Sequence, residues 1–213
     1  MDCSKLAKKD KFSCLSKIDT LTDSEIIQKI VQGDRNMYRK LVERYQPMVF
    51  RTCMGFLHLK EDADDLSQDV FIKAYQTLPA FKGDATFSTW IYRIAVNASL
   101  NKIRKSSKNQ FLQRLETVFR GEKGNEYSFP ISDNENPENI LILNEHKEWI
   151  QKALNSLPEN QRTAIVLSKY DDLPQREIAE IMNTTEGAVE ALIQRAKANL
   201  RGKLSSLKKK SKK

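Results

Sequence analysis

The chain has 213 residues, enough for one or two small domains that each bury a core. Charged residues make up 30% of it and the formal net charge is +8, so we expect a polyanionic partner, nucleic acid first and an anionic membrane surface second. No apolar run is long enough to span a bilayer, and the N-terminus lacks the apolar core of a secretory signal, so we expect a protein that is not inserted in a membrane. The cysteines, Cys3, Cys14 and Cys53, show no C-x-x-C spacing, which argues against a zinc site or a disulfide framework and suits a reducing cytoplasm.

Helical periodicity dominates the first half of the chain, and strand-like alternation is scarce. Each expected helix has an apolar stripe and a start or stop signal at its ends. Four helices are predicted in chain order: one after an N-cap at Thr22 or Asp23, one over residues 37–53, one over residues 63–78 that stops at Pro79, and one after Thr86 or Ser88 that reaches Ile103.

Residues 120–137 differ in composition from the rest of the chain. They are polar, contain Gly, Pro, Asn and Asp, and show no period, which is typical of a linker. Residues 111–119, just before them, have helical spacing and predict a short docking helix. The expected fold is therefore all-α, with two small helical domains joined by a flexible linker and a helix-turn-helix in the second domain. The predicted bounds are 1–22 for a basic N-terminal extension, 23–107 for the first domain, 108–137 for the linker, 138–207 for the second domain and 208–213 for a lysine tail.

Residues 175–195 have the pattern of two short helices that cross at a steep angle. Asn183 stands at the turn, where a residue that tolerates positive φ is needed, and Thr184 or Thr185 caps the second helix. Pro174 suits the first helical position of the preceding helix. The alternative is a generic helical hairpin, but basic residues directly downstream favour contact with DNA phosphates. These basic residues are Arg195, Lys197, Arg201 and Lys203.

An acidic cluster opens the third predicted helix. Its members are Glu61, Asp62, Asp64, Asp65 and Asp69. They leave three interpretations open: a magnesium motif formed by Asp64, Asp65 and Asp69, a solvated helix N-terminus favoured by the helix dipole, and a docking face for a basic protein. No second acidic motif faces the cluster, so we favour docking and expect neither a metal nor a cofactor.

The charge reverses in the fourth predicted helix, because no acidic residue occurs from Ala85 to Leu115. Aromatic residues alternate with polar ones at its start, and aromatic rings beside cations are how single-stranded nucleic acid is held. Trp90 is equally explained as a core residue, and we favour that interpretation. The cations of the stretch are Arg93, Lys102, Arg104, Lys105, Lys108 and Arg114.

Two separated segments together resemble a bacterial sigma-70 family factor of the extracytoplasmic-function subfamily. They are "DADDLSQDVFIKAYQTLPAFKGDATFSTWIYRIAVN" and "LNSLPENQRTAIVLSKYDDLPQREIAEIMNTTEGAVEALIQRAKANL". The resemblance covers residues 24–204 in the order of the family. It implies a cytoplasmic bacterial protein that binds core RNA polymerase and promoter DNA and makes no bond itself. Factors of this subfamily are usually held inactive by an anti-sigma protein, which the resemblance adds as a partner.

The resemblance also assigns residues to three surfaces. The acidic helix of the region 2-like domain would dock on the polymerase, a loop and the following basic helix would hold the −10 element, and the recognition helix of the region 4-like domain would read the −35 element. The polymerase-binding residues are Asp65, Gln68 and Asp69; the −10 residues are Phe81, Lys82, Gly83, Asp84, Phe87, Asn97, Lys102, Arg104 and Lys105; the −35 residues are Arg176, Thr185, Glu186, Glu190, Ala191, Gln194, Arg195 and Lys197.

The recognition helix departs from the commoner family pattern. Many relatives have a basic residue and then Ser after the valine, whereas here Val189 is followed by Glu190 and Ala191. A glutamate accepts from cytosine N4 but repels phosphate, so the resemblance does not carry the family's common −35 bases over to this chain, while Arg195 keeps a basic position.

Two other classes of function remain as alternatives. One is a stand-alone helix-turn-helix regulator with its own sensor domain, and the other is a helical metal-dependent enzyme built on the acidic cluster. His58 and His146 are isolated, and no Ser-His-Asp, Walker or metal constellation is evident, so no catalytic residue and no small-molecule substrate are expected.

Overall fold

The computed structural model describes residues 21–120 and 150–210, with side chains for residues 21–106 and 150–206. All regular structure in these residues is helical, which confirms the predicted all-α class. None of these helices combines the length and apolar character that crossing a membrane requires. The elements are α2 (Asp23–Val31), the 3₁₀ turn η1 (Arg35–Met37), α3 (Tyr38–Leu57), α4 (Lys60–Thr77), the 3₁₀ turn η2 (Leu78–Ala80), α5 (Phe87–Arg120), a helical stretch over 150–155, α7 (Glu159–Lys169), α8 (Gln175–Met182) and α9 (Glu186–Lys210).

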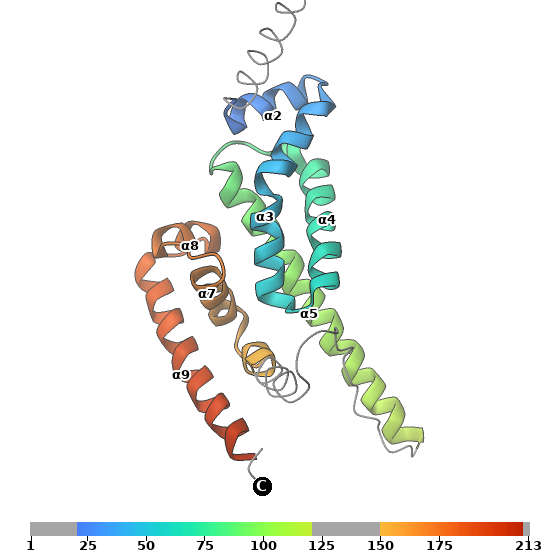
Figure 1. Cartoon of the computed structure of the whole chain (residues 1–213), viewed down its shortest axis with the longest axis vertical. Helices are drawn as coiled ribbons and strands as arrows, with labels where there is room; N and C mark the ends of the chain where they lie inside the picture. The colour runs from blue at the N-terminus through green and yellow to red at the C-terminus, as the bar shows by residue number, and fades with distance from the viewer. Residues whose placement is uncertain (1–20, 121–149, 211–213) are drawn as a thin grey trace, which may run out of the picture.

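The helices form two groups (Figure 1). In the first group α3 and α4 lie side by side, α5 crosses them, and α2 covers one end. In the second group α7 and α8 pack against α9, and this group stands beside α3. Buried side chains of both groups form one contiguous apolar core. Its largest fully buried members are Phe56, Ile26, Leu41, Leu78, Ile91, Leu167 and Ile178.

The start of α2 shows why the first helix begins where the sequence predicts. Thr22 is the N-cap, and its hydroxyl accepts the N–H of Glu25 at 3.3 Å while Glu25 accepts the N–H of Thr22 at 2.7 Å. This reciprocal pair satisfies two backbone donors that a helix N-terminus leaves free. The N-cap prediction at Thr22 is therefore confirmed.

The helix α5 is longer than the sequence analysis expects. It continues from Phe87 to Arg120, so residues 111–119 are the end of α5 and not a separate docking helix, and the expected linker is helical over residues 108–120. The physical reason is that no glycine or proline interrupts these 34 residues. The remainder of the predicted linker, the N-terminal extension up to residue 20 and the end of the lysine tail lie outside the described residues.

The C-terminal end of α3 places a histidine in an apolar environment. His58 caps α3 in the left-handed conformation at φ 60°, and its ring lies 6.0 Å from the ring of Tyr170. Burial, with the nearby positive charge of Arg162 as the smaller cause, lowers the pKa of His58 to about 4.

We expect this shift to make the stability of the fold depend on pH. In the unfolded chain the imidazole has a pKa near 6.5, so between pH 6.5 and 4 the unfolded state binds a proton that the folded state does not bind. Stability is therefore complete above pH 6.5 and falls as the pH drops towards 4, by up to about 3 kcal/mol. Urea unfolding at pH 7 and pH 5 measures the loss. His58→Asn keeps the left-handed cap and removes the titration, so its stability should change less between the two pH values; an identical change in both proteins would contradict the prediction.

Candidate nucleic-acid interface

The turn between α8 and α9 has the geometry that the sequence predicts. Asn183 adopts the left-handed conformation at φ 51°, ψ 54°, and the N–H of Thr184 reaches the carbonyl of Ala179 at 2.9 Å. The hydroxyl of Thr185 then accepts the N–H of Ala188 at 3.2 Å and caps α9. Pro174 is the N-cap of α8, one residue before the predicted position. These contacts confirm the turn of a helix-turn-helix.

The helix α9 turns one face inward and leaves the other free. Val189, Ile193 and Ala196 are buried against α7 and α8 and fix the angle of the helix. Most of the predicted −35 residues lie on the opposite, exposed side, and Ala191 and Lys197 are half-buried. The exposed members are Arg176 on α8 and Thr185, Glu186, Glu190, Gln194 and Arg195 around the first turns of α9. The helix pair thus presents a polar surface that a duplex groove can receive.

The loop between η2 and α5, residues 81–86, projects from a base of aromatic rings. Phe87 is 3% exposed, and its ring lies 5.5 Å from that of Trp90 and 6.1 Å from that of Phe81. Gly83 has φ 78°, a conformation that side chains rarely adopt, and it sharpens the turn at the tip. Lys82 and Asp84 flank it and are exposed.

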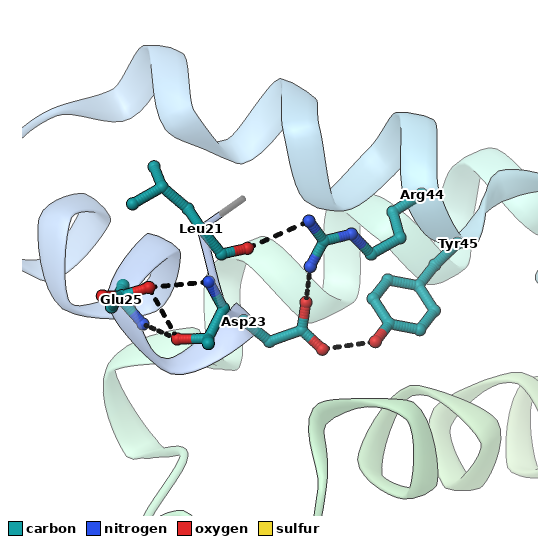
Figure 2. A network of polar contacts seen from close by, with 6 residues as sticks. Leu21, Asp23, Glu25, Arg44 and Tyr45 are labelled. Carbon is teal, nitrogen blue, oxygen red and sulfur yellow. Dashed lines mark hydrogen bonds and ion pairs between the residues drawn. The ribbon is translucent and has the colours of Figure 1, made fainter. Parts of the chain in front are cut away.

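Figure 2 shows a polar network that joins the start of α2 to α3. The Asp23 carboxylate at the start of α2 accepts from the Arg44 guanidinium and from the Tyr45 hydroxyl, and Arg44 also donates to the carbonyl of Leu21 at 3.1 Å. The Tyr45 ring lies 5.1 Å from Phe87, edge to face. The network therefore ties α2 and α3 to the loop. The sequence analysis missed these residues, because single polar residues at 22-residue separation leave no periodic trace.

The basic residues of α5 differ in what they contact. Asn97 and Lys105 are exposed, whereas the Lys102 ammonium lies 2.7 Å from an Asp62 carboxylate oxygen. Arg104 forms a two-pronged ion pair with Glu159 at the start of α7, with one N–O distance of 2.5 Å. This ion pair, first through its hydrogen bond, lowers the pKa of Glu159. Of the expected −10 residues on α5, Lys102 and Arg104 therefore both contact acidic residues of this chain, whereas Asn97 and Lys105 are exposed.

The helix α4 carries an exposed acidic face. Asp65, Gln68 and Asp69 all point to solvent, and Ile72, one turn further on, is 56% exposed beside them. The polar side of this face fits a basic partner, and an exposed isoleucine next to it adds apolar area to the same surface. Among the residues with described side chains, no group of three His, Cys, Asp or Glu side chains is placed to hold a metal ion.

Family models match two parts of the chain. Sigma-70 region 2 matches residues 41–109, which include α4, the loop and the first two thirds of α5. Sigma-70 region 4 matches residues 147–200, which include the helix-turn-helix.

Curated relatives match along nearly their full length. The chain is 33% identical to the ECF RNA polymerase sigma factor SigW of Bacillus subtilis, over 85% of this chain and 96% of the relative. It is 33% identical to the ECF RNA polymerase sigma-E factor of Escherichia coli, over 89% of this chain and 97% of the relative.

Solved structures show the same fold. CnrH in complex with the cytosolic domain of CnrY superposes on this chain with a TM-score of 0.56 at 22% identity, over 85% of this chain and 96% of that one. RpoE from Bartonella quintana, solved in complex with the anti-sigma factor NepR, has a TM-score of 0.52 at 20% identity, over 79% of this chain and 96% of that one.

The fold and the exposed surfaces define a DNA-binding protein of the helix-turn-helix class. Its N-terminal helical domain carries an acidic face on α4. The two matched regions and the relatives show more: the chain belongs to the sigma-70 family of RNA polymerase sigma factors, in the extracytoplasmic-function subfamily. It is a factor of transcription initiation that works with core RNA polymerase and promoter DNA.

Proposed function

We propose that this sigma factor binds core polymerase through α4, holds the opened −10 strand with residues 81–86 and the start of α5, and reads the −35 element with α9. The observation that carries the proposal is the presence on one chain of three exposed surfaces of different chemistry on separate elements. An acidic face fits a basic protein, a loop followed by cations fits single-stranded DNA, and a free recognition helix fits the major groove.

At the −10 element the loop supplies the contacts and the aromatic base supplies rigidity. Phe87 is buried, so we assign it to holding the loop, while half-buried Phe81 and exposed Lys82, Asp84 and Asn97 face the DNA. Cations on α5 neutralise the phosphate backbone of the separated strand, and this electrostatic contribution to DNA affinity weakens as the salt concentration rises.

At the −35 element the first turns of α9 enter the major groove. Glu190 is exposed and accepts from cytosine N4 where a cytosine is present, and Arg195, five residues later, supplies a guanidinium for a base or a phosphate. Since a carboxylate can only accept, and guanine and thymine present only acceptors in the major groove, Glu190 contributes to selection against these bases.

The mechanism involves promoter choice and strand capture, and the chain makes and breaks no covalent bond itself. The site of action is the bacterial cytoplasm, where polymerase and promoter are. An anti-sigma protein is the regulatory partner that we extend to this chain, since the related RpoE was solved with one.

Binding to purified bacterial core polymerase, with no DNA present, tests the proposal. Size-exclusion chromatography of a mixture at micromolar concentration should show one stable complex with one chain per core enzyme. Loss of this complex together with retained duplex binding would instead support a stand-alone regulator.

We expect Arg195→Ala to weaken promoter binding and to leave polymerase binding unchanged. If Arg195 contacts a base, affinity for −35 duplex falls by about 1–3 kcal/mol, and if it contacts phosphate, the slope of log affinity against log salt falls by about one. Titrations of labelled duplex at several salt concentrations distinguish the two. Arg39→Ala is the matched control, because Arg39 is an exposed arginine on α3 whose partner is Glu43 on the same helix. Equal losses in both variants would show that only net charge matters.

A further inference from the structure

The positive charge of the chain is concentrated at its C-terminal end. No acidic residue follows Glu190, whereas nine of the 36 lysines and arginines do, so the residues up to Glu190 carry 27 cations and 28 carboxylates. The formal net charge of +8 therefore comes entirely from the last 23 residues. Most of these residues belong to α9, which runs as one helix to Lys210 (Figure 1), ten residues beyond the end of the region 4 match at residue 200.

We propose that the C-terminal end of α9, residues 201–210, is a second DNA-binding surface. This segment, the basic arm, holds phosphates of the duplex next to the −35 element and reads no bases. Its position along the promoter rests on the proposed function, because the first turns of the same helix set it. Its affinity for duplex phosphates does not rest on that function.

The cations of the basic arm differ from those of the first domain in having no acceptor within the chain. Arg201 and Lys203 are exposed, and neither side chain forms an ion pair or a hydrogen bond with any residue whose side chain the structure describes. In the first domain, ion pairs join Arg51 to the buried Asp171 at 3.2 Å, Lys102 to Asp62 at 2.7 Å and Arg104 to Glu159. The arm cations are therefore free to bind a polyanion.

The basic arm continues the face of α9 that the proposed function places in the major groove. Glu190, Gln194 and Arg201 are separated by four and then seven residues, which puts them in one row on a helix with 3.6 residues per turn, and all three are exposed. Lys208 occupies the next position of this row, seven residues after Arg201. A duplex received by the first turns therefore lies on the same side of α9 as Arg201.

The helix is long enough to reach past the groove. At about 1.5 Å per residue, Arg201 lies about 10 Å further along the axis than Gln194, and Lys210 lies about 24 Å further. The major groove is about 12 Å wide, and phosphates border it on both sides. A helix that enters the groove with its first turns therefore carries its last turns to one of the bordering backbones.

The concentration of like charges distinguishes the basic arm from an ordinary solvated helix face. Lys197 and Arg201 are four residues apart, and like charges at this spacing repel each other on a helix. At the same spacing on α3, Arg39 pairs with Glu43 instead. The helix dipole favours cations only near the last turn, which Arg201 precedes. DNA phosphates remove the repulsion, because they neutralise the cations and release counterions.

An anionic membrane is the other polyanionic surface that a basic helix fits, and it requires a free apolar face. A helix that lies on a bilayer inserts apolar side chains on the side opposite its cations. In α9 this side is turned inward: Val189 and Ile193 are buried against α7 and α8. Leu200 and Leu204 are half-buried, and up to residue 206, where the description of side chains ends, no large apolar side chain of α9 is exposed. The observations therefore favour DNA.

Neutralising two cations of the basic arm tests the proposal. Arg201→Gln with Lys203→Gln removes two exposed charges and keeps a good helix former at both positions. Titration of the full-length chain into a labelled duplex of about 30 base pairs without promoter sequence, from about 50 to 200 mM salt, gives the slope of log affinity against log salt. We expect this slope to be less steep by about two, because each lost phosphate contact removes about 0.9.

Two matched variants separate phosphate contact from net charge. Lys29→Gln with Arg35→Gln removes two exposed cations from α2 and η1, so its slope should equal that of the unchanged chain. Arg201→Lys with Lys203→Arg keeps both charges of the arm and should also keep the slope. An unchanged slope for the neutralised arm, an equal fall in the α2 and η1 variant, or no duplex binding by the unchanged chain at the lowest salt would overturn the proposal.

The length of the duplex tests where the basic arm lies. A duplex with the −35 element of a promoter that the holoenzyme transcribes is compared with the same duplex extended by about ten base pairs, one helical turn, on each side. The extension should raise the affinity of the unchanged chain several-fold more than that of the neutralised arm variant. Equal gains would contradict a contact beyond the element.

Comparison of promoter and unrelated duplexes separates the basic arm from the proposed function. A less steep slope for the neutralised arm, with tighter binding of the −35 duplex than of the unrelated one, supports both. The same slope change without any preference for the −35 duplex would leave the arm standing and refute the reading of the −35 element. Preference with an unchanged slope would refute the arm alone.

Vesicles of phosphatidylglycerol and phosphatidylcholine test the membrane alternative. The unchanged chain and the neutralised arm variant should differ in duplex binding whether or not they bind these vesicles. If the variant loses vesicle binding and keeps the duplex slope of the unchanged chain, the arm is a membrane-binding surface and the proposal is wrong.

Discussion

Replacing Asp65 and Asp69 by alanine is expected to lower the affinity of the chain for core polymerase by about a hundredfold or more. Removing one charge of a close pair at an interface costs about 2 kcal/mol at the lower end, and each factor of ten in Kd is about 1.4 kcal/mol. Both carboxylates are exposed on one face of α4, so the substitution leaves the fold of either half unchanged. Competition binding of labelled chain to core polymerase measures the loss, which should shrink at high salt as the charges are screened.

The matched control removes two other acidic side chains. Asp34 is the exposed N-cap of η1 and Glu43 is exposed on α3, and Asp34→Ala with Glu43→Ala changes the net charge by the same amount. This variant should bind core polymerase as the unchanged chain does. A similar loss in both double variants would show that α4 is not the docking face.

Replacing Arg162 by methionine is expected to destabilise the C-terminal half by about 3 kcal/mol. Arg162 is 5% exposed, and it donates to the carbonyls of Leu154 at 3.0 Å, Asn155 at 2.6 Å and Leu157 at 3.2 Å, where the helical stretch 150–155 ends. Methionine keeps much of the volume but leaves these acceptors without their donor, and a lost hydrogen bond to a charged group costs about 1.5–3 kcal/mol. Burial lowers the pKa of the guanidinium, but it stays charged.

Urea unfolding followed by circular dichroism measures the effect as a lower midpoint. Arg176→Met is the control, because Arg176 is exposed on α8 and its distance to Glu180 is 3.8 Å, so its loss should change stability by less than about 0.5 kcal/mol. The unfolding midpoint of Arg162→Lys should lie between those of Arg162→Met and Arg176→Met, since lysine keeps the charge but lacks the planar guanidinium with its several donors. Equal midpoints for Arg162→Met and Arg176→Met would show that other donors satisfy the three carbonyls.

The local backbone conformation was predictable from the sequence wherever one residue type suits one conformation. Asn183 was expected to adopt positive φ at the turn, and Thr22 was a candidate N-cap at α2; both are found there. Apolar periodicity likewise located α3, α4 and α5. The sequence analysis placed residues 111–119 in a separate helix and missed that α5 is continuous, because the residues between Ile103 and Phe111 are polar, although nothing in them stops a helix.

Contacts between distant residues were not predictable, since a charge in a sequence does not name its partner. The sequence analysis assigned Arg104 to DNA from its charge and from the family resemblance, whereas in the structure it pairs with Glu159. Asp171 gave no sign of its role, because it stands in the short connection after α7 and no periodic pattern includes it. Its burial against α3 follows from how the two helix groups approach each other, which is a property of the whole fold.

The unbroken length of α5 has a mechanical consequence. Its 34 residues make a rod about 50 Å long at 1.5 Å per residue, with the loop of residues 81–86 at one end and the connection to the C-terminal half at the other. The helix α5 packs on both α3 and α4, so the loop at its first residue and the acidic face of α4 belong to one packed bundle. A movement of either surface relative to the other would have to disturb that packing.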